Sequence, residues 1–390
     1  MATKSFDDIL NKLAPLVEQS REMKEILLAN LVMLGEIPAP TFEEEERIEF
    51  LLNRFKEAEL DKTSVDEVGN GIGMIEGEVG EENILIVAHA DTVYSKKTDH
   101  TLTVQPDTVT GAGVADNSLG LAVLATLPFF LDKFDITLKQ NLFLMGATRS
   151  LGRGNLEGLR FFLSNADRPV KVGIGLEGVE LGRLSHTSIG MQRGEITCKV
   201  PEEYDWSRFG DASAILTLNE VINKINGIRL PQRPRTSIVM GSIEGGTSFN
   251  TTALKSTLGF EIRSESAQLV SDINRAIHEI VTEVSSKSGD TIELDIFAER
   301  EPGGIPFSHP LIRRTREIME ELEIESRPGP STSELSAFID HDIPAITLGL
   351  THGDQIHEVN ENIEIAPTFK GIAQVIGTLL AIDGGYCEED

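Results

Sequence analysis

The spacing of apolar residues along the first part of the chain predicts helices. From about Ser5 to Leu34 apolar residues recur at helical spacing, and the segment Ile37–Pro40, with its two prolines, ends that stretch. Thr41 and Glu44 have the spacing of a capping box, in which the two side chains would satisfy the first backbone N–H groups of a new helix. We therefore expect two helices at the start of the chain.

Short apolar runs further along have the length and composition of buried strands. The expected strands are Gly71–Ile75, Ile84–Ala88, Leu142–Ala147 and Val172–Leu176, and a helical stretch covers Leu119–Leu131. The same alternation of helices and strands is expected near the end of the chain. It comprises a helix near Leu311–Leu322, a strand at Ala345–Leu350 and a helix at Ile372–Ile382. This alternation predicts an α/β domain built on a mostly parallel sheet, with helices on both faces.

The middle of the chain has a different order of elements. It reads as strand, helix, two strands, helix and strand, at Glu195–Val200, Ala212–Ile225, Ser237–Ile243, Leu254–Ile262, Leu269–Val284 and Thr291–Phe297. These elements have apolar faces of their own and predict a smaller inserted α+β domain. We expect one domain formed by residues 1–190 and 300–390, and an inserted domain formed by residues 191–299.

Composition narrows the function classes. The 390 residues include 35 Lys and Arg against 63 Asp and Glu, a net charge of -28 that disfavours binding to nucleic acid or to an anionic membrane. The N-terminal residues lack the apolar core of a signal peptide, and no uninterrupted apolar run reaches the ~18 residues of a membrane span. We expect a cytoplasmic protein. Cys198 and Cys387 are too far apart to indicate a thiolate metal site, so any metal would rest on His, Asp and Glu.

Several candidate metal ligands lie where strands are expected to end. His89 and Asp91 end the run Ile84–Ala88, where the strand's period of two can place them on one face. The carboxylate could then hold the second ring nitrogen of the histidine. Asp116 lies in a glycine-rich turn before a helix, Glu177 ends another strand, and His357 follows the strand Ala345–Leu350. Each could be an ordinary polar strand end, but in α/β sheets ligands bind beyond these ends, which favours a metal site.

The combined motifs resemble a known family, the dizinc exopeptidases and deacylases that include tripeptidase T, aminoacylase and the glutamate-releasing carboxypeptidases. The matching segments are His89-Ala90-Asp91-Thr92, Gly111-x-Gly-x-x-Asp116-Asn117, Glu177-Gly178, Gly245-Gly246-Thr247-Ser248-Phe249-Asn250, Arg263 and His357-Glu358-x-x-Glu361. The resemblance implies a metallopeptidase-type α/β domain with an inserted ferredoxin-like lid or dimerisation domain, and a homodimer.

The resemblance also implies a role for each residue. His89, Asp116 and Glu177 would hold one metal, and Asp116 would bridge to a second that His357 also binds. Asp91 would orient His89. Asn250 and Arg263 would bind the substrate, the arginine suiting a terminal carboxylate; taken alone, these two residues would be read as a turn and a surface charge.

The sequence departs from the family at two positions. After the strand Leu142–Ala147 the family has two adjacent glutamates, the first a general base and the second a ligand of the second metal. Here Arg149 and Ser150 occupy those positions. Arginine stays protonated, so it cannot act as a base. We expect at most one divalent metal, zinc or alternatively manganese or cobalt, and an empty second position.

Two further expectations follow from this departure. Arg149 could replace the missing cation by pairing with Asp116 or another pocket carboxylate; alternatively it points to solvent. The family also carries a histidine early in the inserted domain, and the segment Pro201–Ala214 has none.

The resulting expectation for function is a metal-dependent peptidase or amidohydrolase, a metallo-exopeptidase or deacylase acting on small peptides or N-acyl amino acids. Its activity would be impaired or altered, with Glu334, Glu358 or Glu361 as candidates for a displaced base. The alternative is a non-catalytic family member that binds a peptide or amino acid or acts as a scaffold. The sequence does not identify the substrate.

Overall fold

The structure is a computed structural model, which describes residues 5–166, 168–200 and 213–389. The helices are α1 (Phe6–Arg21), α2 (Lys24–Gly35), α3 (Glu45–Glu57), α4 (Leu119–Lys133), α5 (Glu157–Asn165), α6 (Ala214–Asn226), α7 (Ala267–Ser288), α8 (Pro310–Glu321), α9 (Leu335–Asp340) and α10 (Ile365–Asp383). Two shorter helical turns are η1 (Val114–Ser118) and η2 (Gly152–Gly154).

The strands are β1 (Lys62–Val65), β2 (Gly71–Ile75), β3 (Asn83–His89), β4 (Thr103–Val104), β5 (Thr108–Thr110), β6 (Asn141–Ala147), β7 (Val170–Val179), β8 (Arg183–Ser188), β9 (Gly190–Lys199), β10 (Thr236–Gly245), β11 (Lys255–Ser264), β12 (Thr291–Arg300), β13 (Gly303–Gly304), β14 (Arg327–Ser331), β15 (Ala345–Thr351), β16 (Gly353–Asp354) and β17 (Asn362–Glu364). They form three sheets: one of nine strands and two of four.

Contacts divide the chain into two compact units, residues 1–188 with 304–390, and residues 189–303. The larger unit contains the nine-stranded sheet, in the order β1-β2-β6-β3-β7-β15-β8-β13 with β14 beside β8. Its four central strands, β6, β3, β7 and β15, are parallel, whereas β2 and β8 join them in the antiparallel sense. The α/β class expected from the sequence is confirmed, with antiparallel strands at the sheet edges.

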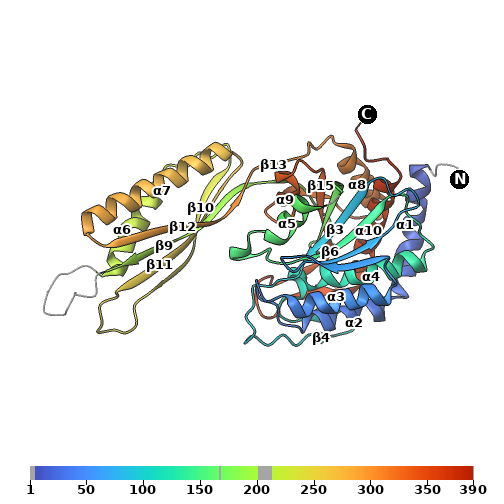
Figure 1. Ribbon diagram of the computed structural model, residues 1–390, viewed down its shortest axis with the longest axis horizontal. Coiled ribbons are helices and arrows are strands. Elements are labelled where there is room, and N and C mark those ends of the chain that lie inside the picture. The colour runs from blue at the N-terminus through green and yellow to red at the C-terminus, as the bar shows by residue number, and fades with distance from the viewer. Residues whose placement is uncertain (1–4, 167, 201–212, 390) are drawn as a thin grey trace. The chain divides into compact units, whose positions relative to one another are not determined.

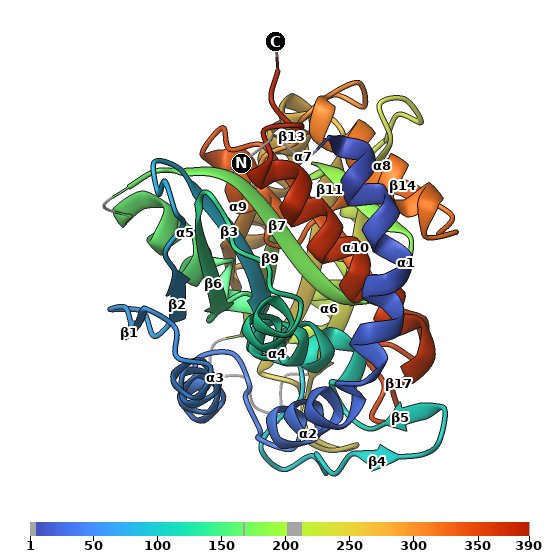
Figure 2. The same ribbon diagram turned by 90° about the vertical axis from the view of Figure 1, so that its right-hand side faces the viewer.

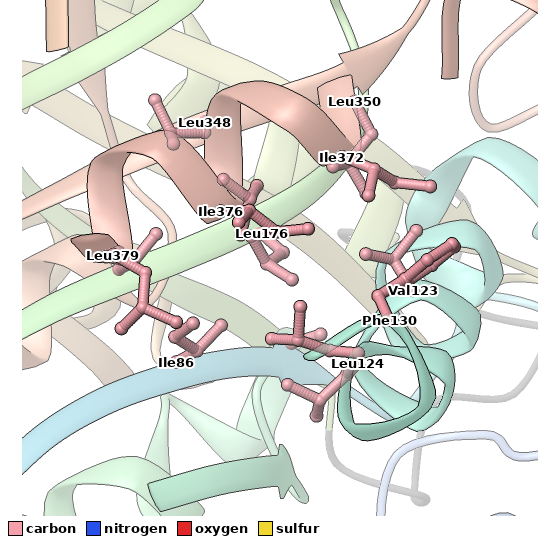
Figure 3. Close-up of a cluster of buried hydrophobic side chains, with 14 of the residues drawn as sticks. Ile86, Val123, Leu124, Phe130, Leu176, Leu348, Leu350, Ile372, Ile376 and Leu379 are labelled. Carbon is pink, nitrogen blue, oxygen red and sulfur yellow. The ribbon is translucent and has the colours of Figure 1, made fainter. Parts of the chain in front are cut away.

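Helices cover both faces of this sheet. On one face α4 and α10 pack over β3, β7 and β15, as the close-up of Figure 3 shows for Leu124, Leu176 and Ile376. Figure 2 shows α1 lying alongside α10. On the other face a smaller apolar cluster joins α5 and α9 to the strands, with Phe338 fully buried. Strands covered on both faces lack polar alternation, which explains why all seven residues of β3 are buried.

The smaller unit is an antiparallel sheet in the order β10-β11-β9-β12, with α6 and α7 packed on it (Figure 1). The chain order of strand, helix, two strands, helix and strand, combined with this strand order, is the ferredoxin-like arrangement. The predicted α6 helix began at Ala212, which lies outside the described residues, as does most of the histidine-free segment Pro201–Ala214.

Two expectations for the N-terminal region are wrong. Three helices, not two, precede β1, because the long helical stretch is interrupted between α1 and α2. Thr41 and Glu44 do not form a capping box. Helix α3 begins at Glu45, and the Thr41 and Glu44 side chains bind distant residues near the predicted metal site.

Two helical stretches, Val114–Lys133 and Ile365–Asp383, are long and apolar enough to cross a membrane by composition. Most of each stretch is buried inside the larger unit, 89% of the first and 78% of the second. Their apolar character is therefore accounted for by the core, because both belong to the cluster that covers the sheet.

Candidate metal centre

His89, Asp116 and Glu177 come together at the carboxyl end of the central parallel strands. His89 is the last residue of β3, Glu177 lies near the end of β7, and Asp116 lies in η1, just before α4. One donor atom from each lies within 4.8 Å of the others. Parallel strands end at the same edge of a sheet, so two segments separated by 88 positions in the chain can supply ligands to one point.

His89 is buried, and each of its ring nitrogens has a carboxylate neighbour. Its Nδ1 lies 3.0 Å from the main-chain oxygen of Asp91 and 3.3 Å from Asp91 Oδ1. Its Nε2 lies 3.0 Å from Asp116 Oδ1. Asp91 is itself fixed, because its Oδ2 accepts hydrogen bonds from the Thr41 hydroxyl and from the Leu151 N–H, both at 2.8 Å. This arrangement leaves Nε2 as the nitrogen that faces the cluster.

His357 lies in the loop between β16 and β17 and reaches the other side of Asp116. Its Nε2 lies 2.9 Å from Asp116 Oδ2, and its side chain is largely exposed. The two oxygens of one carboxylate are thus shared between two histidines. His357 is not among the three residues whose donor atoms cluster within 4.8 Å.

Burial and charge determine the protonation of the cluster. Burial is the largest influence on Glu177 and raises its pKa to about 7, with the negative charge of Asp116 acting in the same direction. Burial also acts on Asp116, but hydrogen bonds from His357 and His89 outweigh it and hold the Asp116 pKa below its usual range. Burial opposes the charged form of His89, yet its bonds to Asp116 and Asp91 raise its pKa well above the ordinary value. The shift of His89 follows from the carboxylates gathered around it.

Asn117 fixes the distance between Asp116 and Glu177. Its fully buried amide donates to the Leu176 carbonyl at 2.8 Å and accepts from the Gly178 N–H at 2.9 Å. These two backbone groups lie on either side of Glu177. Asn117 belongs to the glycine-rich motif of the sequence, but no local pattern indicates this role.

Glu361 binds the backbone of both segments that carry Asp116 and His357. Its Oε2 accepts from the N–H groups of Ala115, at 3.0 Å, and Asp116, at 3.3 Å. Its Oε1 accepts from the His357 N–H and from the Tyr94 hydroxyl, both at 2.9 Å. Glu361 is completely buried, so its carboxylate orders the segments that carry these two residues.

A buried arginine that sequence reasoning missed supports the chain beside His89. Arg47, on α3, has no exposed surface and donates to the carbonyls of Ile37, Gly35 and Ala90. Burial lowers its pKa to about 10, and the negative charge of Asp91 opposes that shift. In the sequence Arg47 is one charged residue of an amphipathic helix, with no local signal for this role.

The expectation that Arg149 pairs with Asp116 is wrong. Its guanidinium pairs with Glu157 at 2.8 Å and lies over the ring of Phe42, 5.8 Å from the centroid. The cause is local: the turn after β6 brings the Glu157 N–H to the Arg149 carbonyl, at 3.1 Å. Ser150 is buried, and its hydroxyl has no hydrogen-bond partner among the described residues.

Asn250 and Arg263 both belong to the smaller unit. Arg263, on β11, bonds to Glu261, which also pairs with Arg193. Asn250 Oδ1 accepts a hydrogen bond from the Ser248 hydroxyl at 3.0 Å. The substrate-binding roles expected for these residues stay predictions.

The residues present fit one divalent metal. One imidazole nitrogen and two carboxylates match the three-ligand donor set of catalytic zinc sites, and the same donors suit manganese or cobalt. A cation would also compensate the negative charge of the two carboxylates. The second position offers fewer donors, because Arg149 turns to Glu157 and Ser150 is a neutral hydroxyl.

Comparisons with known proteins concern the fold and the family. Several solved structures share the fold. A tripeptidase from Staphylococcus aureus has a TM-score of 0.73 at 17% identity, covering 92% of this chain and 98% of that one. The dipeptidase Dug1p from Saccharomyces cerevisiae has 0.78 at 12% identity, covering 96% and 99%. A dinuclear metal-binding peptidase of family M20 from Bacillus subtilis has 0.61 at 14% identity, covering 91% and 99%.

At these identities the similar structures show the fold alone. A search of curated protein sequences gives no match. The family model for peptidase family M20/M25/M40 matches residues 85–381, which include His89, Asp116, Glu177 and His357. This match spans most of the chain, and the protein therefore belongs to peptidase family M20/M25/M40.

Proposed function

We propose that the protein is a metal-dependent hydrolase of an amide bond in small peptides or N-acyl amino acids. The observation that carries the proposal is the convergence of His89, Asp116 and Glu177, one donor from each of three separate elements, with Asn117 and Glu361 holding them in place. Similar structures include a tripeptidase and a dipeptidase, which supports amide hydrolysis as the reaction class.

We propose a single divalent metal, zinc or alternatively manganese or cobalt, held by these three residues. A metal bound there would polarise the amide carbonyl and lower the pKa of water. The chain's own residues would supply the geometry: Asp91 orients His89, and Glu361 sets Asp116. His357 would then be a neighbour of the site through Asp116 Oδ2, not a ligand of the first metal.

A non-catalytic role is the second candidate. The observation that favours it is the Arg149–Ser150 segment, which places neither a base nor a metal ligand at the end of β6. Such a protein would keep the metal pocket and bind a peptide or an amino acid without cleaving it.

One experiment separates the two candidates. The purified protein is analysed for bound metal and tested against dipeptides, tripeptides and N-acyl amino acids with added zinc, manganese or cobalt. His89→Ala and the double variant Arg149→Glu with Ser150→Glu are tested in parallel. Metal-dependent turnover by the wild type that His89→Ala abolishes supports the hydrolase. Turnover only in the double variant supports the binding role.

We further propose a homodimer located in the cytoplasm, with the smaller unit as the dimerisation or lid domain. Support for the dimer comes from β10, an edge strand that exposes Val239, Met240 and Ile243. Light scattering of the wild type and of Ile243→Lys tests it: the wild type should have twice the monomer mass and the variant should dissociate. A monomeric wild type would contradict the proposed dimer.

A further inference from the structure

We propose that Arg183 binds a free carboxylate of the substrate and makes the protein selective for amide bonds that lie next to a negatively charged group. The inference deepens the proposed hydrolase function, and it rests on that function for the position of the scissile bond at the candidate metal ligands. It gives a substrate-binding role to a residue of the larger unit.

Arg183 lies between the candidate metal ligands and a polar cavity. It is the first residue of β8, and its Nη1 is 4.0 Å from Oε1 of Glu177, one of the three clustered residues. The same side chain lines a cavity of about 350 Å³, together with Ser185, Ser331 and Thr332. Cavities of this size bind small molecules. The guanidinium is therefore placed to contact a ligand that occupies the cavity and extends to the cluster.

The Arg183 guanidinium keeps its hydrogen-bond donors available. Its distance from Glu177 exceeds the ~2.7–3.2 Å of a hydrogen bond, and within the described parts of the chain its side chain makes no hydrogen bond. Solvent reaches it, because 36% of the side chain is exposed. Arginine stays charged and carries five N–H donors in a planar fork that matches a carboxylate. These donors are free to bind an anionic group of a ligand.

A second arginine adds positive charge to the same cavity. Arg327 is paired in register with Arg183 on the neighbouring strand β14, and both line the cavity. Residues paired in this way lie on the same face of a sheet, where like charges repel each other. Arg327 is compensated by Glu180, which accepts a hydrogen bond from its Nη1 at 3.1 Å. Arg183 has no carboxylate at that distance among the described residues, so a bound anion would pair with Arg183.

The distance between Arg183 and Glu177 fits a carboxylate that is one residue away from the scissile bond. One extended residue spans ~3.3–3.6 Å, which is close to the 4.0 Å between these two side chains. An amide group held at the cluster would thus bring the carboxylate of the adjoining residue to the guanidinium. The terminal carboxylate of a dipeptide or an N-acyl amino acid has this position, and it would form a charge-assisted, bidentate contact.

Arg263 is the arginine for which the family resemblance implies carboxylate binding, and its contacts differ. It belongs to the smaller unit, where its Nε donates to Glu261. The Arg183 guanidinium has no equivalent hydrogen bond. A test of the proposal therefore includes both arginines.

The test compares acids with their amides, which differ in the charge of one group. The probes are N-acetylalanine, N-acetylleucine and alanylleucine, each with its C-terminal amide. Binding is measured by calorimetry on the full-length protein without metal, because a carboxylate could otherwise bind the metal itself. Hydrolysis is measured with added zinc, and zinc affinity by competition with a chromogenic chelator.

Four variants are compared with the wild type. Arg183→Gln removes the charge, and Arg183→Lys keeps the charge but not the planar fork. Arg263→Gln tests the rival arginine. Arg21→Gln is the matched control, on an exposed arginine of α1 that pairs with Glu18. Thermal melting of each variant shows whether it is folded.

We expect the wild type to bind acids at least tenfold more tightly than the matching amides. Arg183→Gln should weaken binding of the acids by ~10- to 100-fold, the usual contribution of hydrogen bonds to a charged group, and change that of the amides less than threefold. KM for the acids should rise by the same factor with kcat changed less than threefold. Arg183→Lys should lie between the two, and Arg21→Gln should match the wild type.

Three outcomes overturn the assignment. The first is equal binding of acids and amides by the wild type. The second is a preference for acids that Arg263→Gln removes and Arg183→Gln retains. The third is a loss of zinc affinity of tenfold or more in Arg183→Gln, with acids and amides weakened alike, because Arg183 would then position Glu177. If Arg183→Gln does not fold, unchanged binding of acids by Arg183→Lys overturns the bidentate contact.

Failure of the proposed hydrolase has a different signature. Acid-selective binding through Arg183 without turnover of any substrate overturns the hydrolase and leaves Arg183 as the carboxylate-binding residue of a non-catalytic protein. Metal-dependent turnover of acids and amides alike overturns the role of Arg183 and leaves the hydrolase. A wild type that neither binds nor cleaves any of these compounds overturns both.

Discussion

The Tyr94 hydroxyl donates a hydrogen bond of 2.9 Å to Glu361, a residue 267 positions further along the chain. This contact closes a network in which one buried carboxylate holds the loop after β3, the η1 turn and the His357 loop. Burial and the hydrogen bond to Glu361 both raise the pKa of Tyr94, so it remains a donor under all physiological conditions.

Glu361→Gln should therefore destabilise the protein as well as the site. An amide cannot accept four hydrogen bonds, and its NH₂ group would face N–H donors, so we expect the free energy of unfolding to fall by ~2–4 kcal/mol. Urea denaturation measures this change. Glu358→Gln, on an exposed residue of the same loop, is the control and should stay within ~0.5 kcal/mol of the wild type. Equal stabilities would contradict the structural role of Glu361.

Metal stoichiometry tests the assignment of ligands. Elemental analysis and calorimetric titration should give one divalent metal per chain. Glu177→Gln removes one of the three anionic or imidazole donors and should weaken binding by 100-fold or more. His357→Ala should weaken it less than tenfold, because the His357 side chain reaches the cluster through Asp116 Oδ2. Two tightly bound metals in the wild type would show that the second position is functional.

Arg149 should contribute little to either stability or metal binding. Its ion pair with Glu157 is partly exposed, and such pairs contribute ~0–1 kcal/mol. We expect Arg149→Ala to lower the free energy of unfolding by less than ~1 kcal/mol and to leave zinc affinity unchanged. Glu157→Ala is the matched control and should behave in the same way. Loss of metal binding in Arg149→Ala alone would indicate a role at the site that the Glu157 pairing does not provide.

Gly178 should be intolerant of a side chain. A Cβ atom at this position would lie 2.2 Å from the carbonyl oxygen of Ala115, the residue before Asp116. Gly178→Ala must therefore push β7 away from η1, and we expect a loss of ~1–3 kcal/mol in stability together with at least tenfold weaker zinc binding. Gly329→Ala, at a glycine with open space around it, is the control. A Gly178→Ala variant that binds zinc as the wild type does would rule out tight coupling between β7 and η1.

The two cysteines should be unreactive in the folded protein. Burial raises the pKa of Cys198 to about 11 and that of Cys387 to about 12. At pH 8 the reactive thiolate would be about 0.1% or less of each thiol, against roughly a quarter for a free cysteine of pKa ~8.5. Reactivity should increase as pH approaches these values. Ellman's reagent should label neither thiol at pH 8 until denaturant is added, whereas an introduced Ser64→Cys, on an exposed residue of β1, should react at once.

The strands and the three candidate ligands that lie together could be predicted because their signals are local. An apolar run such as Ile84–Ala88 in β3 marks a central strand, and strand periodicity places the residue after it, His89. Thr41 and Glu44 show where local reasoning fails: their spacing also satisfies a capping box, but Asp91 and the Arg149 N–H bind them instead. The role of Glu361 depends on donors up to 267 positions away, which no local pattern encodes.

The Asn117 side-chain amide makes hydrogen bonds to the backbone of Leu176 and Gly178, on either side of Glu177. This has a consequence for redesign of the protein. The scaffold that sets the ligands is built from Asn117, Glu361 and Arg47, and none of these contacts uses the side chains of residues 149 and 150. The side chains at positions 149 and 150 can thus be changed without altering these supporting contacts. A complete two-metal centre could be installed by two substitutions, or the first metal position studied in isolation, with the same supporting framework in both cases.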